Sequence, residues 1–201
     1  MQYRLCLVLI VATLTFAGHA QATPATTDQL NQFMGAASFG HLGPNEQNIL
    51  SQNLSSEDVS AYLDFTKSDQ GQRYQAFNAQ ANALSNDSMK AMMAGKVTAP
   101  TSGVLSKDQI DKCSHFLLQA TNFQMLEYMR AHDKSDDGVT ENVMMQLLLT
   151  QYPEQIAALY EKYKGDQPAF EKYNQSQAAQ DIMGVTLKIV QQSVKDKTPV
   201  H

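Results

Sequence analysis

An acidic segment at residues 133–138, Asp-Lys-Ser-Asp-Asp-Gly, has residue types and a spacing that can bind calcium. Asp133, Ser135 and Asp137 would place oxygen atoms at the first, third and fifth positions of an EF-hand loop, with glycine at the sixth. The twelfth position needs a bidentate Glu, and here it is Met144. We therefore expect an acidic loop between two helices, with calcium binding as the weaker hypothesis.

Cys113 and His115 are the next candidates, as ligands of a transition metal. Residues two apart on a helix point in different directions, so this pair is poorly placed to share one ion. His132 and His41 could complete a set only through tertiary contacts, and the sequence lacks the paired short spacings of structural zinc sites. We therefore predict no metal site. We expect Cys113 to be a buried apolar side chain, with a reactive thiol or an intermolecular disulfide as alternatives.

The ten methionines are a further candidate feature, because thioether sulfur binds Cu(I). They lie among Leu, Phe and Ala at helical spacing, which favours packing in a core or in an adaptable partner groove. For catalysis, the chain has no Gly-x-Ser-x-Gly nucleophile motif and no glycine-rich phosphate loop. The sequence predicts no catalytic residues and no cofactor, and it leans against an enzyme without excluding one.

The elements that would position these side chains are helices, because strand-like alternation is absent and Ala, Gln, Leu, Met, Lys and Glu dominate. Two serine capping boxes with hydrophobic staples, in residues 54–59 and 105–110, mark helix starts. We predict an all-α fold, an irregular bundle of six or seven helices with the C-terminal helix at its centre. The predicted helices are 27–36, 45–53, 55–67, 69–94, 106–131, 140–164 with a candidate break at Pro153, and 168–195.

Residues 1–22 are predicted to be a signal peptide outside the fold. Arg4 precedes an uncharged apolar run over residues 5–17, and Ala20 and Ala22 are small residues that suit a signal peptidase. Cleavage after Ala22 is favoured, with cleavage after Ala20 as the alternative. The sequence therefore predicts a periplasmic or secreted protein.

After cleavage the chain, residues 23–201, is predicted to be a single helical domain, with 96–104 as a boundary between candidate sub-domains 23–95 and 105–201. Removing Arg4 from the 15 basic residues leaves 14 against 20 acidic ones, a net charge of −6. This balance disfavours nucleic acid and anionic lipid, since both attract clustered positive charge. No later run stays apolar over the roughly 20 residues that span a bilayer, so we predict no stable membrane anchor.

Two segments carry similar residues at the same spacing of three. Aromatic side chains three apart share one helix face, and small residues further along permit close helix approach. The match is either an internal duplication, a two-fold pseudo-repeat, or a coincidence between two amphipathic helices. The first segment has Tyr62, Phe65, Ser68, Gly71 and Tyr74, and the second has Phe170, Tyr173, Ser176, Ala179 and Ile182.

The first of these segments also carries a family resemblance. The motif combines the acid-rich helix start at 54–59 with Tyr62, Phe65, Ser68, Gly71, Gln72 and Tyr74. With these residues, about 50–95 of the chain resembles a family of exported bacterial proteins known as domain of unknown function number 2059. Many members have Pro in the turn where this chain has Asp69 or Gln70. The resemblance implies a helical protein of the cell envelope, and it implies no activity.

The function predicted from these observations is a non-catalytic one, in protein–protein interaction or envelope maintenance. The protein would present an apolar groove with Met and Tyr side chains to an unknown protein partner, either an unfolded client or a partner helix. One alternative is a periplasmic immunity or inhibitor protein against a toxin. A further alternative is a ligand-binding protein or hydrolase with a helical pocket.

Overall fold

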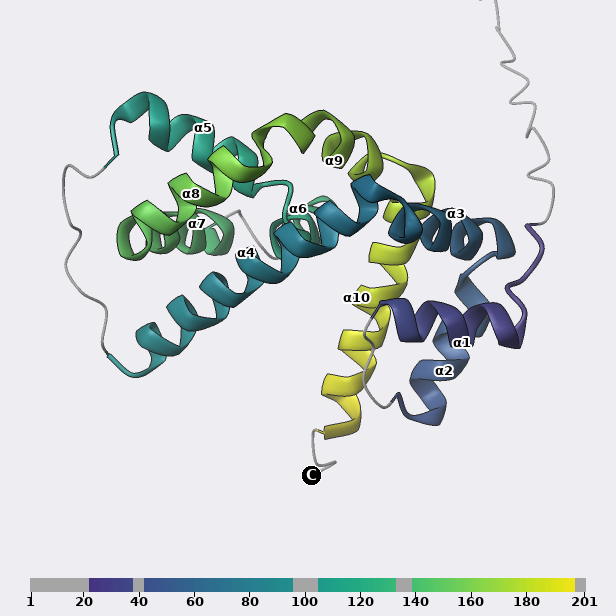
Figure 1. Ribbon diagram of the computed structural model, residues 1–201. Coiled ribbons are helices and arrows are strands. Elements are labelled where there is room, and N and C mark those ends of the chain that lie inside the picture. Colours follow the sequence, from purple (N-terminus) through teal and green to yellow (C-terminus); the bar gives the residue numbers. More distant parts are fainter. Residues whose placement is uncertain (1–21, 38–41, 96–104, 133–138, 198–201) are drawn as a thin grey trace, which may run out of the picture.

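The computed structural model describes residues 22–37, 42–95, 105–132 and 139–197 (Figure 1). Within these ranges the chain forms ten α-helices and one short 3-10 helix, η1, and no β-strand, which confirms the all-α fold. The elements are α1 Thr27–Ala36, α2 Pro44–Asn53, α3 Ser56–Lys67, α4 Asp69–Met93, α5 Lys107–Leu117, α6 Thr121–His132, α7 Val139–Gln151, α8 Pro153–Tyr163, η1 Lys164–Asp166, α9 Gln167–Asn174 and α10 Gln177–Lys197. The predicted signal peptide lies outside the described residues except for its last one.

The two predicted capping boxes begin α3 and α5. Ser55 Oγ accepts the backbone N–H of Asp58 at 3.0 Å, and the Asp58 carboxylate accepts the Ser55 N–H at 3.3 Å. Ser106 and Gln109 make the same reciprocal pair at 3.3 and 2.9 Å. Each box satisfies N–H groups that a helix start leaves unpaired. The predicted starts of these two helices are therefore confirmed.

The number of α-helices in the described ranges is higher than predicted because three of the predicted helices are divided, one of them at the predicted candidate break. The predicted helix 106–131 ends at Leu117 and resumes at Thr121. The Asn78 side chain on α4 accepts the Thr121 N–H at 2.7 Å, so α6 is capped by a residue of another helix. A single helix was expected here because a tertiary cap leaves no local signal in the sequence.

The last two predicted helices are also divided. In 168–195, α9 ends at Asn174 and α10 begins at Gln177. In 140–164 the chain breaks before Pro153, as predicted, because a proline fits the first turn of a helix but not its interior.

The apolar side chains form two cores. The first lies among α4, α5, α6, α7, α8 and α9, and its most deeply buried side chains include Phe77, Phe116, Phe123, Leu148, Ile156 and Phe170. The second lies among α1, α2, α3 and α10, with Leu30, Phe33, Leu50, Leu54, Val59, Leu63, Val185 and Ile189. Full burial of such a side chain stabilises the fold by about 1.5–3 kcal/mol.

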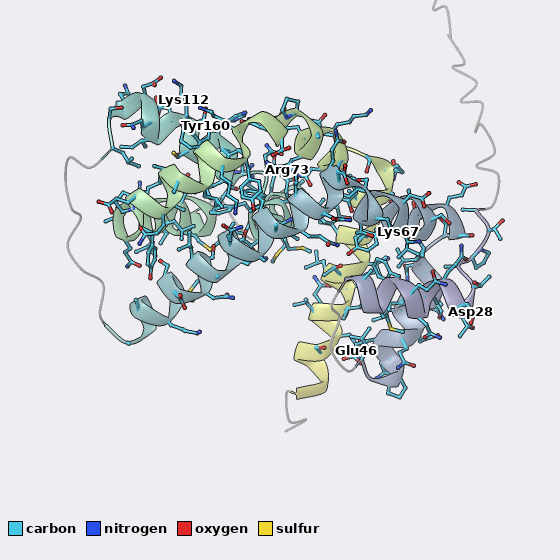
Figure 2. All side chains as sticks on the ribbon, in the orientation of Figure 1. Asp28, Glu46, Lys67, Arg73, Lys112 and Tyr160 are labelled. Atoms are coloured by element: carbon cyan, nitrogen blue, oxygen red, sulfur yellow. The ribbon has the colours of Figure 1, made fainter. Side chains whose placement is uncertain are left out.

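Each long helix packs against the short helices of the other half of the chain (Figure 1). Helix α4 runs beneath α7 and α8 (Figure 1). Arg73, on α4 (Figure 2), binds Asp166 in η1 with nitrogen–oxygen distances of 2.7 and 2.9 Å. Helix α10 packs against α2 and α3, and Lys188 donates to Asn53 Oδ1 at 2.6 Å. A boundary at 96–104 therefore does not separate the two cores.

Candidate functional site

The residues considered first for metal chemistry do not form one site. Cys113 is 1% exposed in the first core, as expected, and burial raises the pKa of its thiol. His115 is exposed, with Nε2 3.5 Å from Glu171 Oε1. No group of three His, Cys, Asp or Glu side chains that could hold a metal occurs within the described ranges. The calcium candidates Asp133, Ser135 and Asp137, together with His41 and the His132 side chain, lie outside what the structure describes.

The methionines that the structure places lie mainly against apolar side chains. Met144 and Met145 pack on the first core and Met34 on the second. Met183 is 7% exposed and Met89 is 37% exposed. Apart from the exposed Met89, these side chains pack between helices, in agreement with the packing interpretation.

The two segments of similar sequence form two similar corners between helices. Ser68 follows α3 and its Oγ accepts the N–H of Gly71 at 3.0 Å. Ser176 follows α9 and its Oγ accepts the N–H of Ala179 at 3.3 Å. The Ser68 N–H donates to Phe65 O at 3.0 Å and the Ser176 N–H to Tyr173 O at 2.9 Å. The same spacing therefore produces the same local geometry in both places.

The aromatic residues of the two corners meet one another. The rings of Phe65 and Tyr173, which occupy equivalent positions, stack with centroids 3.8 Å apart and an interplanar angle of 6°. Tyr74 meets Phe65 and Tyr173 edge-on, at 5.7 and 5.4 Å, and Phe170 at 5.0 Å. Edge-to-face pairs are a favourable arrangement because the ring edge is positive and the ring face is negative. This cluster joins the corner that begins α4 to the corner that begins α10.

A buried polar network lies next to the aromatic cluster. The Tyr74 hydroxyl donates to Asn174 Oδ1 at 2.6 Å, and Asn174 Nδ2 donates to the Gln119 backbone and side-chain oxygens, both at 3.1 Å. All three residues are less than a tenth exposed. Burial raises the pKa of the Tyr74 phenol, so it stays a neutral donor. Gln119 and Asn174 gave no signal in the sequence, because polar residues on helices are usually solvent-facing.

A cleft of about 620 Å³ opens between α3 and α4 on one side and α10 on the other, with the ends of α1, α6 and α9 at its borders. Figure 1 shows α4 and α10 diverging from the region of the two corners. Tyr62, Phe65, Tyr74 and Tyr173 line the cleft, and so does the buried Asn82 Oδ1, which accepts no hydrogen bond from the residues that the structure describes. The other lining residues are Ala36, Ala37, Thr66, Gln75, Asn78, Ala79, Thr121, Gln124, Asn174, Ala179, Ile182, Met183 and Thr186.

None of the residues that line this cleft carries a charge, and five of them are primary amides. A primary amide both donates and accepts hydrogen bonds, so it can pair with the N–H and C=O groups of a peptide. The aromatic and aliphatic side chains provide apolar contact area. The cleft therefore suits a neutral, partly apolar ligand, and three of the six family-like residues, Tyr62, Phe65 and Tyr74, lie on its wall.

A second cavity of about 510 Å³ adjoins the cleft and lies among α5, α6, α9 and α10. Gln124 and Asn174 line both cavities. The lining of the second cavity is mostly polar and includes His115, Glu127 and Glu171, but no Ser, Thr or Cys from the described part of the chain. A hydrolase that forms a covalent intermediate on one of these nucleophiles therefore gains no support from this cavity.

Comparison of the chain with family models, with curated proteins and with solved structures finds no match. The resemblance to domain of unknown function number 2059 therefore stays a prediction. No helix in the described part of the chain has the length and apolar character to cross a membrane.

Proposed function

We propose that this chain is a non-catalytic protein of the bacterial envelope that binds a segment of another protein in the cleft between α4 and α10. The observation that carries the proposal is the lining of the cleft, in which aromatic rings and primary amides occur together without a charged side chain. Ligand pockets are typically apolar with a few polar groups that fix orientation, and about 300–1,000 Å³ is their usual size.

The polar groups of the cleft favour a peptide over a purely apolar ligand. Asn82 Oδ1 is buried with no hydrogen-bond donor among the described residues, which is a costly arrangement unless a ligand donates to it. Gln75 and Asn78 lie further along the same helix face and add further donors and acceptors. A segment of protein can satisfy such groups with its own backbone while it places apolar side chains on Phe65 and Tyr173.

The location is proposed from the N-terminal sequence. Residues 1–22 have the charge, apolar run and small residues of a signal peptide, and the family resemblance of residues 50–95 agrees with an exported protein. An envelope location brings the cleft into contact with proteins that cross this compartment unfolded and with proteins that reside there.

The test is a photo-crosslinker in the cleft of the protein inside the cells that make it. Benzoylphenylalanine replaces Gln75, which is exposed and lines the cleft, and in a control it replaces Ala158, which is exposed on α8 away from either cavity. We expect protein adducts from position 75 and none from position 158. Equal adducts at both positions, or none at position 75, would contradict the proposal.

A matched pair of substitutions shows whether the cleft itself is responsible. Ala79 is exposed and lines the cleft, whereas Ala83 is exposed one turn later on α4 and does not line it. Ala79→Trp fills the cleft and is expected to abolish the adducts, and Ala83→Trp is expected to leave them unchanged. One dominant partner that proves to be a toxin would favour the immunity alternative, and several unrelated partners would favour a binding role for unfolded clients.

A further inference from the structure

We infer that the protein segment bound in the cleft carries an arginine side chain that enters the adjoining second cavity. This inference rests on the proposed function and names the chemistry of the partner. Among the described residues, the cleft is lined by uncharged side chains alone, whereas the second cavity is lined by two carboxylates and by no Lys or Arg. The two cavities thus differ in charge although they share part of their wall.

The shared wall connects the two cavities into one binding surface. Asn174, at the end of α9, and Gln124, on α6, line both of them. Asn174 is held by the Tyr74 hydroxyl and by Gln119, and Gln124 Nε2 donates to Leu118 O at 2.6 Å. A ligand that contacts Asn174 from the cleft therefore lies next to the entrance of the second cavity, so a long side chain of that ligand can continue into it.

The carboxylates of the second cavity come from two helices. Glu171 lies on α9 and Glu127 on α6. Gln167 Nε2 donates to Glu171 Oε1 at 2.8 Å, and His115 Nε2 lies 3.5 Å from the same oxygen. Both of these contacts are made to Oε1 of Glu171. A cation that reaches this cavity can therefore pair with the other carboxylate oxygen, Oε2.

An arginine fits this cavity better than a metal ion. His115, Glu127 and Glu171 line the cavity, but no three His, Cys, Asp or Glu side chains in the described part of the chain are grouped so that they could hold a metal ion. Its wall instead contains the side chains of Gln119, Gln175 and Gln180, whose carbonyl oxygens accept N–H groups. A guanidinium has five N–H donors in a plane, so it can pair with a carboxylate and with neighbouring amides together.

The partner expected from this arrangement is a segment with an apolar face and one arginine beside it. Burial of the segment's apolar side chains in the cleft would provide most of the affinity. The carboxylates of the second cavity would favour segments that carry an arginine over segments that do not. The probes are two fluorescent helix-forming peptides of leucine and alanine. They differ at one central position, which is arginine in the first and citrulline, its neutral isostere, in the second.

The measurement is the affinity of the two peptides for the full chain by fluorescence anisotropy. We expect the arginine peptide to bind about tenfold more tightly than the citrulline peptide at low salt, and the ratio to fall as salt is added. The double substitution Glu127→Gln and Glu171→Gln is expected to remove the difference, so that both peptides bind like the citrulline peptide. Glu154→Gln, an exposed site on α8, is the control and should preserve the ratio.

The outcomes separate this inference from the function on which it rests. Equal affinities for the two peptides, both weakened by Ala79→Trp, would overturn the arginine and leave the cleft as a binding site. If neither peptide binds, both the segment-binding cleft and the arginine site in the second cavity are overturned for helical apolar segments. A tenfold ratio that persists in the Glu127→Gln, Glu171→Gln protein would also overturn the inference, because the charge would then be recognised elsewhere. Circular dichroism of each variant confirms that it is folded.

Discussion

The α3–α4 corner and the α9–α10 corner share a serine cap and differ in how closely their helices approach. At the first corner only Ser68 separates the two helices, whereas Gln175 and Ser176 separate them at the second. A Cβ atom at Gly71 would lie 1.7 Å from the backbone oxygen of Phe65, so no side chain fits there. The equivalent position of the second corner is Ala179, which is buried and keeps its methyl group.

The difference teaches that a cap and a close approach have separate causes. A serine three residues before an N–H group can cap any helix start, whatever the angle between the two helices. The close approach is set by the residue that faces the preceding helix, which is glycine at one corner and alanine at the other. The last of the five positions also differs, since Tyr74 joins the buried polar network and its counterpart Ile182 is apolar.

The largest effect that separates the corners is expected from exchanging their small residues. Gly71→Ala forces the backbones of α3 and α4 apart and should lower the free energy of unfolding by at least about 3 kcal/mol. Ala179→Gly loses a buried methyl group and some helix propensity, about 1–2 kcal/mol. Urea denaturation of the two variants measures both values. Equal losses would show that the first corner is no tighter than the second.

Alkaline pH tests the buried tyrosines, one from each corner. Burial raises the pKa of both Tyr74 and Tyr173 above the ordinary value of 10.0. For Tyr173, the neighbouring Tyr74 raises the pKa further. The unfolded chain therefore loses these protons near pH 10 while the folded chain keeps them. Folded-state stability is intact below pH 10 and is lost as the pH rises towards the raised values, by about 1.4 kcal/mol per pH unit for each tyrosine.

Unfolding by urea at a series of pH values above 10 measures this slope. Tyr173→Phe removes one of the two groups, so it is expected to make the slope shallower by about 1.4 kcal/mol per pH unit. A slope that is unchanged in this variant would mean that Tyr173 ionises as easily in the folded chain as in the unfolded one.

Removing the Tyr74 hydroxyl tests the buried polar network, to which the first corner contributes a residue and the second corner, at the equivalent position, does not. Tyr74→Phe removes the donor to Asn174 Oδ1 and leaves a buried acceptor unpaired, which should cost about 2 kcal/mol. Ile182→Val, the comparison at the second corner, removes one methyl group from a partly buried side chain and should cost about 1 kcal/mol or less. Thermal or urea unfolding measures the loss of stability in both variants. A larger loss from Ile182→Val than from Tyr74→Phe would show that the Tyr74 hydroxyl contributes less to stability than one methyl group of Ile182.

The smallest expected effect is the one that should be equal at both corners. Ser68→Ala and Ser176→Ala each remove one side-chain cap and should each cost about 1 kcal/mol. Hydrogen exchange of the Gly71 and Ala179 amides reports the loss locally. If only one of the two amides exchanges faster, the caps are not equivalent and the similarity of the corners is limited to their spacing.

Local features of this fold could be predicted because each depends on residues within a few positions. The helix starts at Ser55 and Ser106 follow from capping boxes, and the break at Pro153 follows from the missing N–H of proline. The burial of Cys113 follows from its place among apolar residues. The similarity of 62–74 and 170–182 was visible for the same reason, since a spacing of three is a local property.

The sequence by itself thus determined the class of fold, most helix boundaries and the position of the α3–α4 corner, whereas the α9–α10 corner lies inside a segment predicted to be one helix. Only the tertiary structure decided the cap that Asn78 provides to α6, the packing of α4 and α10 against the opposite half of the chain, and the cleft between them. The physical reason is that these contacts depend on which helix faces meet, and this is set by the packing of the whole chain. The amides Gln119 and Asn174 have the same sequence signature as exposed residues, so their burial appears only when the helices are assembled.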